Sequence, residues 1–346
     1  MNSYALISKY RRFLMGAAAV WLLLFHSAFT LSGHGFYRPV AYLFKTVGYG
    51  CVDIFMLLSG FGLYRSLAKS EAVLPFWQRR ARRLLPSYYP VVLLWIGVML
   101  SLSGITPKDI LGNLTCAGWF IDPASVQMNW YPQAVWLFYL LAPPIAALIR
   151  TSRRPGLTTV ALIGVSALCG ASAFGRPQLL MALARFPVYI LGFYLGRRAA
   201  EGADIRLIPR LGLYVLAAAG LGFTRILWCF PSLNAEHLLA HYGLYFYPMA
   251  LAAPGLCLLL SRLAAHMDRC FLRPLVRGVA ALGDCSFEVL LLQVLINELY
   301  SGLKVPVTTL TALLAVLLAA GLALVYGRFI RRLTPRLFPE KPGEAL

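Results

Sequence analysis

The sequence predicts an all-α membrane protein, a polytopic bundle of about ten transmembrane helices with both termini in the cytoplasm. Of the 346 residues, 60% are hydrophobic and only 13% are charged, and the mean hydropathy is +0.71. Soluble domains carry about a quarter of charged residues, so this composition excludes them. Apolar runs of membrane-spanning length also recur along the whole chain, and the Lys and Arg residues gather between alternate runs.

Each predicted helix is an apolar run of about 17 to 25 residues, the length that the hydrocarbon core of a bilayer requires. In chain order the runs cover residues 13–31, 46–64, 87–104, 134–150, 157–174, 178–196, 208–225, 243–261, 279–300 and 306–327. The longest polar stretches between them, near 65–86, 105–133 and 197–209, are too short for an independent hydrophobic core. We therefore expect one membrane domain over residues 1–346, which ends in a short basic cytoplasmic tail at 328–346.

The basic residues give the orientation, because cytoplasmic loops carry the excess of Lys and Arg. With the amino terminus inside, all but seven of the 32 Lys and Arg residues fall on the cytoplasmic side. The exceptions are Arg38, Lys45, Lys108, Arg176, Arg185, Arg225 and Lys304. The net charge of +19 does not indicate nucleic-acid binding, because these residues lie at helix ends and form no continuous groove. Membrane lipids with anionic headgroups are the expected partners.

Six blocks of residues follow one another in a recognisable order. The first predicted helix carries a histidine, His26, toward its outer end. The second carries an Asp-Phe-Ser-Gly pattern, formed by Asp53, Phe55, Ser59, Gly60 and Phe61. An arginine-rich segment comes next, with Arg79, Arg80, Arg83, Pro86 and Tyr88. The later blocks are Trp130 with Phe138, Tyr139, Leu140, Leu141 and Pro143, then Arg185, Phe186 and Pro187 with Gly192 and Gly196, and finally Leu282 and Gly283 with Ser286. In these blocks the chain resembles the acyltransferase-3 family of integral membrane enzymes over most of its length.

The resemblance implies a membrane-bound O-acyltransferase that moves an acyl group, with acetyl favoured, from acyl-CoA to a hydroxyl of a sugar, glycan or envelope precursor. It implies acyl-CoA as co-substrate with no bound cofactor, a carbohydrate or lipid-linked glycan as acceptor, and a multi-pass location in the cell membrane, with the bacterial inner membrane favoured. No Cys and His spacing suits zinc, so we expect no metal. The alternative is a transporter or flippase that passes an acylated or glycosylated molecule without chemistry.

His26 and Asp53 are predicted to lie at similar depths in the membrane. His26 lies about 13 residues along the first helix, roughly 20 Å from its cytoplasmic start, and Asp53 roughly 10 Å below the outer surface on a helix that runs the opposite way. A neutral imidazole can take a proton from an attacking hydroxyl, and a neighbouring Asp can fix its tautomer. A histidine that only packs between helices, and an Asp that only pairs with an arginine, are the structural alternatives.

Arg185 is the candidate partner of Asp53 or a stabiliser of the oxyanion, although its charge could instead reach the headgroups. Guanidinium groups match the geometry of phosphates, so Arg79, Arg80 and Arg83 are predicted to hold the phosphates of CoA. A basic loop that only fixes the topology explains the same charges.

Further substrate-binding candidates are Ser59, Trp130, Tyr139 and Glu288. Trp130 lies in a predicted outer loop, where it could stack on a sugar or belong to the interfacial aromatic belt. On the ninth predicted helix, Ser286, Gln293 and Asn297 lie near one face, and Asp284 and Glu288 share another. These faces could line a polar cavity or bond to neighbouring helices.

Three positions depart from the family pattern. Met15 stands where a basic residue is usual, with Arg11 and Arg12 about a turn earlier. Val135 stands where many relatives have a glutamate, and Gln293 where a histidine often follows the Leu-Gly-x-x-Ser motif. The departures at Met15 and Val135 bear on binding of the acyl donor, and the departure at Gln293 bears on any role of a second histidine.

Overall fold

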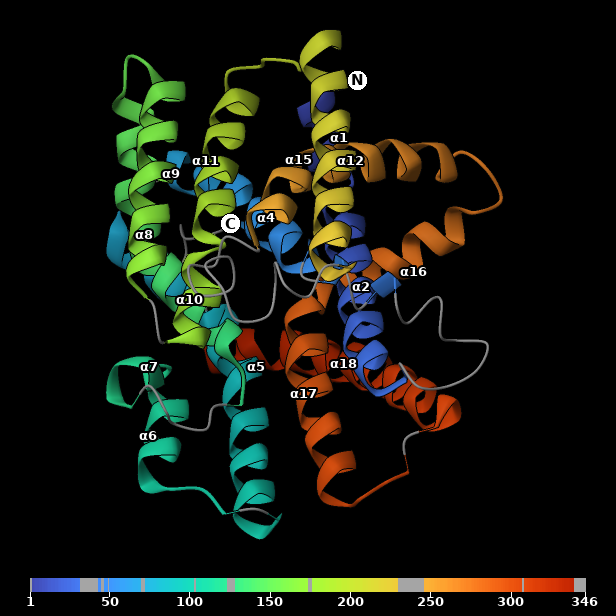
Figure 1. The fold of residues 1–346 in the computed structure, drawn as a ribbon. Helices are drawn as coiled ribbons and strands as arrows, with labels where there is room; N and C mark the ends of the chain where they lie inside the picture. Colours follow the sequence, from blue (N-terminus) through green and yellow to red (C-terminus); the bar gives the residue numbers. More distant parts are fainter. Residues whose placement is uncertain are drawn as a thin grey trace.

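The computed structural model describes residues 2–31, 43–44, 47–48, 50–69, 72–102, 104–122, 128–173, 176–229, 246–306 and 308–338. All regular structure in these residues is helical, which confirms the predicted all-α class (Figure 1). The helices are α1 Ser3–Lys9, α2 Arg11–Leu31, α4 Gly50–Lys69, α5 Val73–Leu102, α6 Pro107–Thr115, α7 Gly118–Ile121, α8 Trp130–Thr151, α9 Pro155–Ser172, α10 Pro177–Leu183, α11 Phe186–Ala200, α12 Leu207–Cys229, α15 Tyr247–Met267, α16 Arg273–Asp284, α17 Ser286–Gly302 and α18 Thr309–Leu337.

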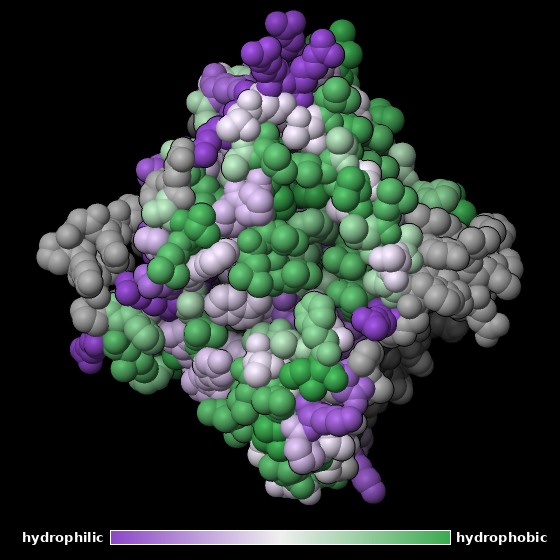
Figure 2. All heavy atoms as spheres, turned by 90° about the vertical axis from the view of Figure 1, so that its left-hand side faces the viewer, coloured by the Kyte–Doolittle hydropathy of each residue, from purple (hydrophilic) through white to green (hydrophobic). Residues whose placement is uncertain are grey.

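Many of these helices are long and apolar enough to cross a membrane. Eight described segments meet this condition, and α16 with α17, which meet at an angle of 73°, make up to nine. Apolar side chains cover the middle of the face in Figure 2, and hydrophilic ones gather mainly at its upper end. The chain is a multi-pass membrane protein. The number of about ten spans and the cytoplasmic location of both termini stay predictions.

Three predicted segments have other bounds in the structure. The arginine-rich segment is not a loop, because α5 begins at Val73 and carries these arginines on helical turns. Arginine has a high helix propensity, so a helix can continue through an arginine-rich segment although the hydropathy of that segment is low. The predicted helix 178–196 is interrupted between α10 and α11, where Pro187 lies in the first turn of the new helix. The predicted helix 279–300 bends at Cys285, so Asp284 and Glu288 lie on different helices and do not share a face.

The ends of two further helices also differ from the prediction. The helix α4 begins at Gly50, which puts Asp53 in its first turn and not about seven residues along it. The last helix continues to Leu337, so the predicted basic tail begins as helical turns of α18, and residues 339–346 lie outside the described part of the chain. The predicted outer loop 105–133 contains two short helices, α6 and α7.

The helix α4 is the central helix of the bundle. Protein covers 72% of its most apolar stretch, against 17% for α9 and for α12, which therefore face lipid. It packs closely on α11 through Gly60, Gly192 and Gly196, because a Cβ atom at any of these would overlap the backbone of the other helix. Small residues let membrane helices approach in this way. The close approach fixes the start of α11, where Arg185 lies, against α4.

We predict that Gly192→Val destabilises the protein by about 1 to 3 kcal/mol, because the added side chain overlaps the carbonyl of Leu57. Gly164→Val is the matched control, since nothing lies within 4 Å of a Cβ atom on this glycine of α9. Thermal unfolding of both variants in detergent tests the prediction. Equal midpoints for the two variants would contradict the close contact of α4 with α11.

Candidate active site

A cavity of about 880 Å³ near the predicted site residues is strongly basic. Seven basic side chains line it and none of the lining residues is acidic; they are Arg11, Arg12, Arg65, Lys69, Arg79, Arg80 and Arg83. They come from the start of α2, the end of α4 and the first half of α5. We call this space the cationic cavity. Such a concentration of guanidinium groups suits a ligand with several phosphates.

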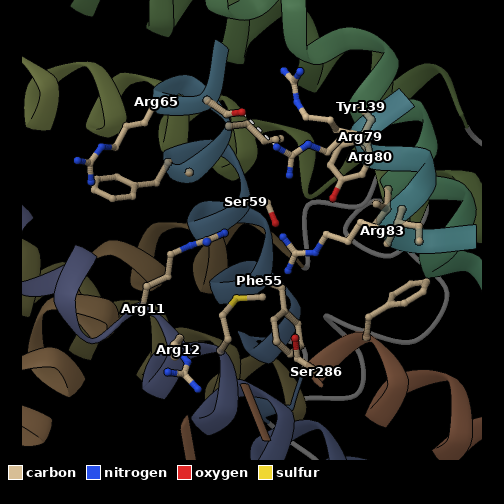
Figure 3. A pocket seen from close by; sticks show the side chains of 18 of the residues that line it. Arg11, Arg12, Phe55, Ser59, Arg65, Arg79, Arg80, Arg83, Tyr139 and Ser286 are labelled. Carbon is tan, nitrogen blue, oxygen red and sulfur yellow. Dashed lines mark hydrogen bonds between the residues drawn. The ribbon is translucent and has the colours of Figure 1, made fainter. Parts of the chain in front are cut away.

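The arginines of the cationic cavity do not all point the same way. Arg11, Arg80 and Arg83 extend toward one another around Ser59, whereas Arg79 and Arg65 point away from them (Figure 3). Arg80 donates to the Ser66 hydroxyl at 3.2 Å, and its guanidinium lies 5.3 Å from the Phe76 ring centre.

The buried Nε atoms of Arg11 and Arg80 have no hydrogen-bond partner among the described residues. A buried N–H without a partner is costly, which indicates that these groups are built for an anionic ligand. Arg11 was noted in the sequence as a basic residue near Met15 but was not among the residues predicted to bind CoA. It lies four residues before Met15, on the same face of α2, and both line the cavity. Arg11 therefore supplies to this cavity, from one helical turn earlier, the basic charge that Met15 lacks.

A second cavity, of about 290 Å³, adjoins the cationic cavity and contains His26. Tyr131 and Leu290 line both spaces, so the two cavities are neighbours with these side chains at their common boundary. The other walls are mostly apolar, and among the described residues Arg185 is the only charged one that lines this cavity. The imidazole packs edge-on against the Phe25 ring at 5.2 Å between ring centres, and the described residues offer it no hydrogen bond. We call this space the His26 cavity.

Asp53 and Arg185 are two buried groups of opposite charge that interact electrostatically, although no salt bridge or hydrogen bond joins them among the described residues. Asp53 is completely buried, and neither carboxylate oxygen has a hydrogen-bond partner among the described residues. The positive charge that acts on it is that of Arg185, which is 1% exposed. The Arg185 guanidinium donates to the Met181 carbonyl at 3.0 Å and lies 3.8 Å from the Phe246 ring centre. Asp53 also lies in the first turn of α4, where the helix dipole favours a negative charge.

The expected contact of Asp53 with His26 is not found. No hydrogen bond joins them in the described residues, and Asp53 does not line the His26 cavity. The cause is the position of Asp53 in α4, whose first turn directs the side chain into the protein and not into the cavity. Arg185 links the His26 cavity to Asp53, since it lines this cavity and also interacts with Asp53.

The remaining predicted residues divide into two groups. Ser59 and Tyr139 line the cationic cavity, and Trp130 lines the His26 cavity, where its ring centre lies 5.5 Å from the Arg185 guanidinium. Glu288 lines none of the described cavities near the site. It accepts a hydrogen bond of 2.6 Å from the buried Ser87 hydroxyl, which joins α17 to α5.

A third cavity, of about 700 Å³, adjoins the His26 cavity from the other side. His26 and Gln293 line both spaces. Its walls are formed by α2, α17 and α18, and we call it the side cavity. The three cavities therefore follow one another, the cationic cavity, the His26 cavity and the side cavity, and His26 lies at the boundary between the second and the third.

A family model for the acyltransferase domain of the acyltransferase-3 type matches residues 13–328, nearly the whole chain. The chain belongs to the acyltransferase-3 family. It is thus a membrane enzyme that transfers acyl groups other than aminoacyl groups. No curated protein and no solved structure matches this acyltransferase-3 chain. The part of the enzyme that the structure describes contains no group of three His, Cys, Asp or Glu residues that could hold a metal ion.

We predict that Arg185→Gln and Asp53→Asn each lower the free energy of unfolding by about 3 kcal/mol, because each leaves one buried charge without its counter-charge. The double variant should lose clearly less than the sum of the two, because it removes both charges. Unfolding of the four proteins in detergent gives the coupling energy. Strictly additive losses would show that the two side chains do not interact.

Proposed function

We propose that this acyltransferase-3 enzyme transfers an acyl group, with acetyl favoured, from acyl-CoA to a hydroxyl of a sugar, glycan or envelope precursor in the cell membrane. The observation that carries the proposal is the cationic cavity and its common boundary with the His26 cavity. A cavity of this volume is typical of small-molecule sites, and its basic lining suits the phosphates of CoA. We infer no bound cofactor, because acyl-CoA supplies the acyl group as a substrate.

The arrangement of the cavities supports a division of the donor between two spaces. The phosphates would bind to Arg11, Arg80 and Arg83, and the thioester arm would pass Tyr131 and Leu290 into the His26 cavity. Arg79 would contribute through its charge more than through direct contact, because it points away from the other arginines (Figure 3). Ser59 and Tyr139 offer hydroxyl groups beside the same donor.

In the proposed reaction, His26 takes the proton from the acceptor hydroxyl while that oxygen attacks the thioester carbonyl carbon. A C–O bond forms and the C–S bond to CoA breaks. The imidazolium of His26 then gives the proton to the CoA thiolate. Arg185 would stabilise the negative charge that develops on the carbonyl oxygen, and Asp53 would hold Arg185 in place.

We predict that His26→Ala lowers acyl transfer by about 10² to 10⁴-fold, the range expected for the loss of a general base. His266→Ala is the matched control, because this histidine is exposed at the end of α15 and lines none of the three cavities. Membranes with each variant are incubated with radiolabelled acetyl-CoA, and the labelled glycan or lipid is measured. Undiminished labelling by a well-expressed His26→Ala protein would refute the assignment. Movement of substrate across liposomes without consumption of acyl-CoA would favour the transporter alternative.

We predict that Arg11→Gln and Arg80→Gln each raise the KM for acyl-CoA about tenfold or more, because each removes charge-assisted hydrogen bonds to phosphate. Arg262→Gln provides the matched control, since this exposed arginine of α15 lies outside the cavities. Initial rates at varied acetyl-CoA concentration give the KM values. An unchanged KM in both cavity variants would place the CoA phosphates elsewhere.

A further inference from the structure

We propose that the side cavity is the acceptor site, and that its ligand is a glycolipid whose uncharged, hydroxylated headgroup reaches His26 while its apolar chain lies along α18. The proposal rests on the acyl transfer proposed above and adds where the acceptor binds and what kind of molecule it is. Four observations carry it: the position of the cavity, its unpartnered amides, its apolar wall and its neighbouring lipid-facing surface.

The position of the side cavity separates the acceptor from the donor. His26 and Gln293 form its boundary with the His26 cavity, and none of the seven basic residues of the cationic cavity lines it. A hydroxyl in this space can approach the imidazole from one side while a thioester approaches from the other. Two substrates of one transfer need such separate routes to one base, because the base must contact the attacking oxygen and not the CoA phosphates.

Apart from Lys304 at its rim, the polar wall of the side cavity consists of neutral groups. Gln293 is 5% exposed, and its amide forms no hydrogen bond with the described residues. Asn297 lies four residues later, on the same side of α17, and also lines the cavity without a described hydrogen bond. Tyr300 and Ser301 continue this wall, and no Asp or Glu lines the space. A buried amide without a described partner, that of Gln293, indicates a ligand that both donates and accepts hydrogen bonds, as sugar hydroxyl groups do, and the half-buried Asn297 offers such a ligand a second amide.

The opposite wall of the side cavity is apolar and belongs to α18. Ala312, Ala315 and Val316 line it at helical spacing, and their small side chains leave room beside the helix. Leu317 on the outer face of the same helix is 67% exposed, which indicates contact with lipid. An alkyl chain that leaves the cavity along α18 would therefore pass from an apolar wall directly into the bilayer. Lys304, exposed at the rim, offers a positive charge to a phosphate that links the headgroup to this chain.

The test uses dodecyl glucoside as the acceptor probe and the full-length protein in lipid nanodiscs. Ala315→Trp fills the cavity beside α18 and should raise the KM for dodecyl glucoside about tenfold while the KM for acetyl-CoA stays unchanged. Leu317→Trp is the matched control, because it places the same side chain two residues away on the lipid-facing surface. Asn297→Leu gives a second variant of similar volume, in case Ala315→Trp disturbs the fold. Thermal unfolding of each variant reports on folding.

The outcomes separate the two proposals. Glucose without an alkyl chain should be a much poorer acceptor than dodecyl glucoside for the unmodified enzyme. An equal KM for dodecyl glucoside in Ala315→Trp, Asn297→Leu and the unmodified enzyme would overturn the acceptor site, even if acetyl transfer itself proceeds. Transfer to neither probe, together with a lack of acetyl-CoA consumption in native membranes, would refute the acyl transfer and the acceptor site with it. A photoreactive dodecyl glucoside that labels residues 312–316 of α18 would support the site independently of turnover.

Discussion

The arrangement of this acyltransferase depends on one buried carboxylate. Asp53 is fully enclosed at the start of the central helix α4, in a part of the protein where an uncompensated charge costs several kcal/mol. Arg185 supplies the opposite charge, and it comes from the break between α10 and α11. Gly60 and Gly192 hold α11 against α4 at backbone contact distance. The electrostatic and steric requirements thus act on the same pair of helices, and together they fix the Arg185 guanidinium at the wall of the cavity that contains His26.

The three cavities differ in charge in a way that suits acyl transfer between two unlike substrates. Among the residues that the structure describes, seven basic ones line the first cavity, Arg185 alone is charged in the second, and Lys304 lies at the rim of the third. An anionic donor is therefore attracted to the first cavity and held there. Around His26 the walls are mostly apolar, so a developing oxyanion meets one fixed charge in surroundings that screen it weakly.

Much of the fold could be predicted from the sequence, because bilayer thickness sets the length of an apolar run and the periodicity of a helix sets its face. The position of the Asp53 side chain relative to His26 could not be predicted from the sequence. Equal depth in the membrane does not determine the direction in which a side chain points, and a start at Gly50 turns Asp53 into the protein. The break between α10 and α11 at Arg185 could not be predicted either, because it lies within one apolar run in which only Pro187 indicates the start of a new helix. Arg11 was noted in the sequence as a basic residue about a turn before Met15, but it was not among the predicted binding residues, because the family pattern places the basic residue at position 15; residues four apart share a helix face, and Arg11 lines the cavity with Met15.

Gln293 shows how this chain can work with a single base. The position lies at the junction of the His26 cavity and the side cavity, where the family pattern often has a histidine. An amide cannot take up a proton, but it can donate to one oxygen and accept from another, which suits it to orient an acceptor hydroxyl. The proposed transfer from acyl-CoA would not require a second imidazole, because its leaving group would be a thiolate, whose conjugate acid has a pKa of about 8.5 and which departs with little proton assistance. One imidazole can therefore remove the hydroxyl proton and return it to sulfur, provided that Gln293 and Arg185 hold the reacting oxygens on either side of it.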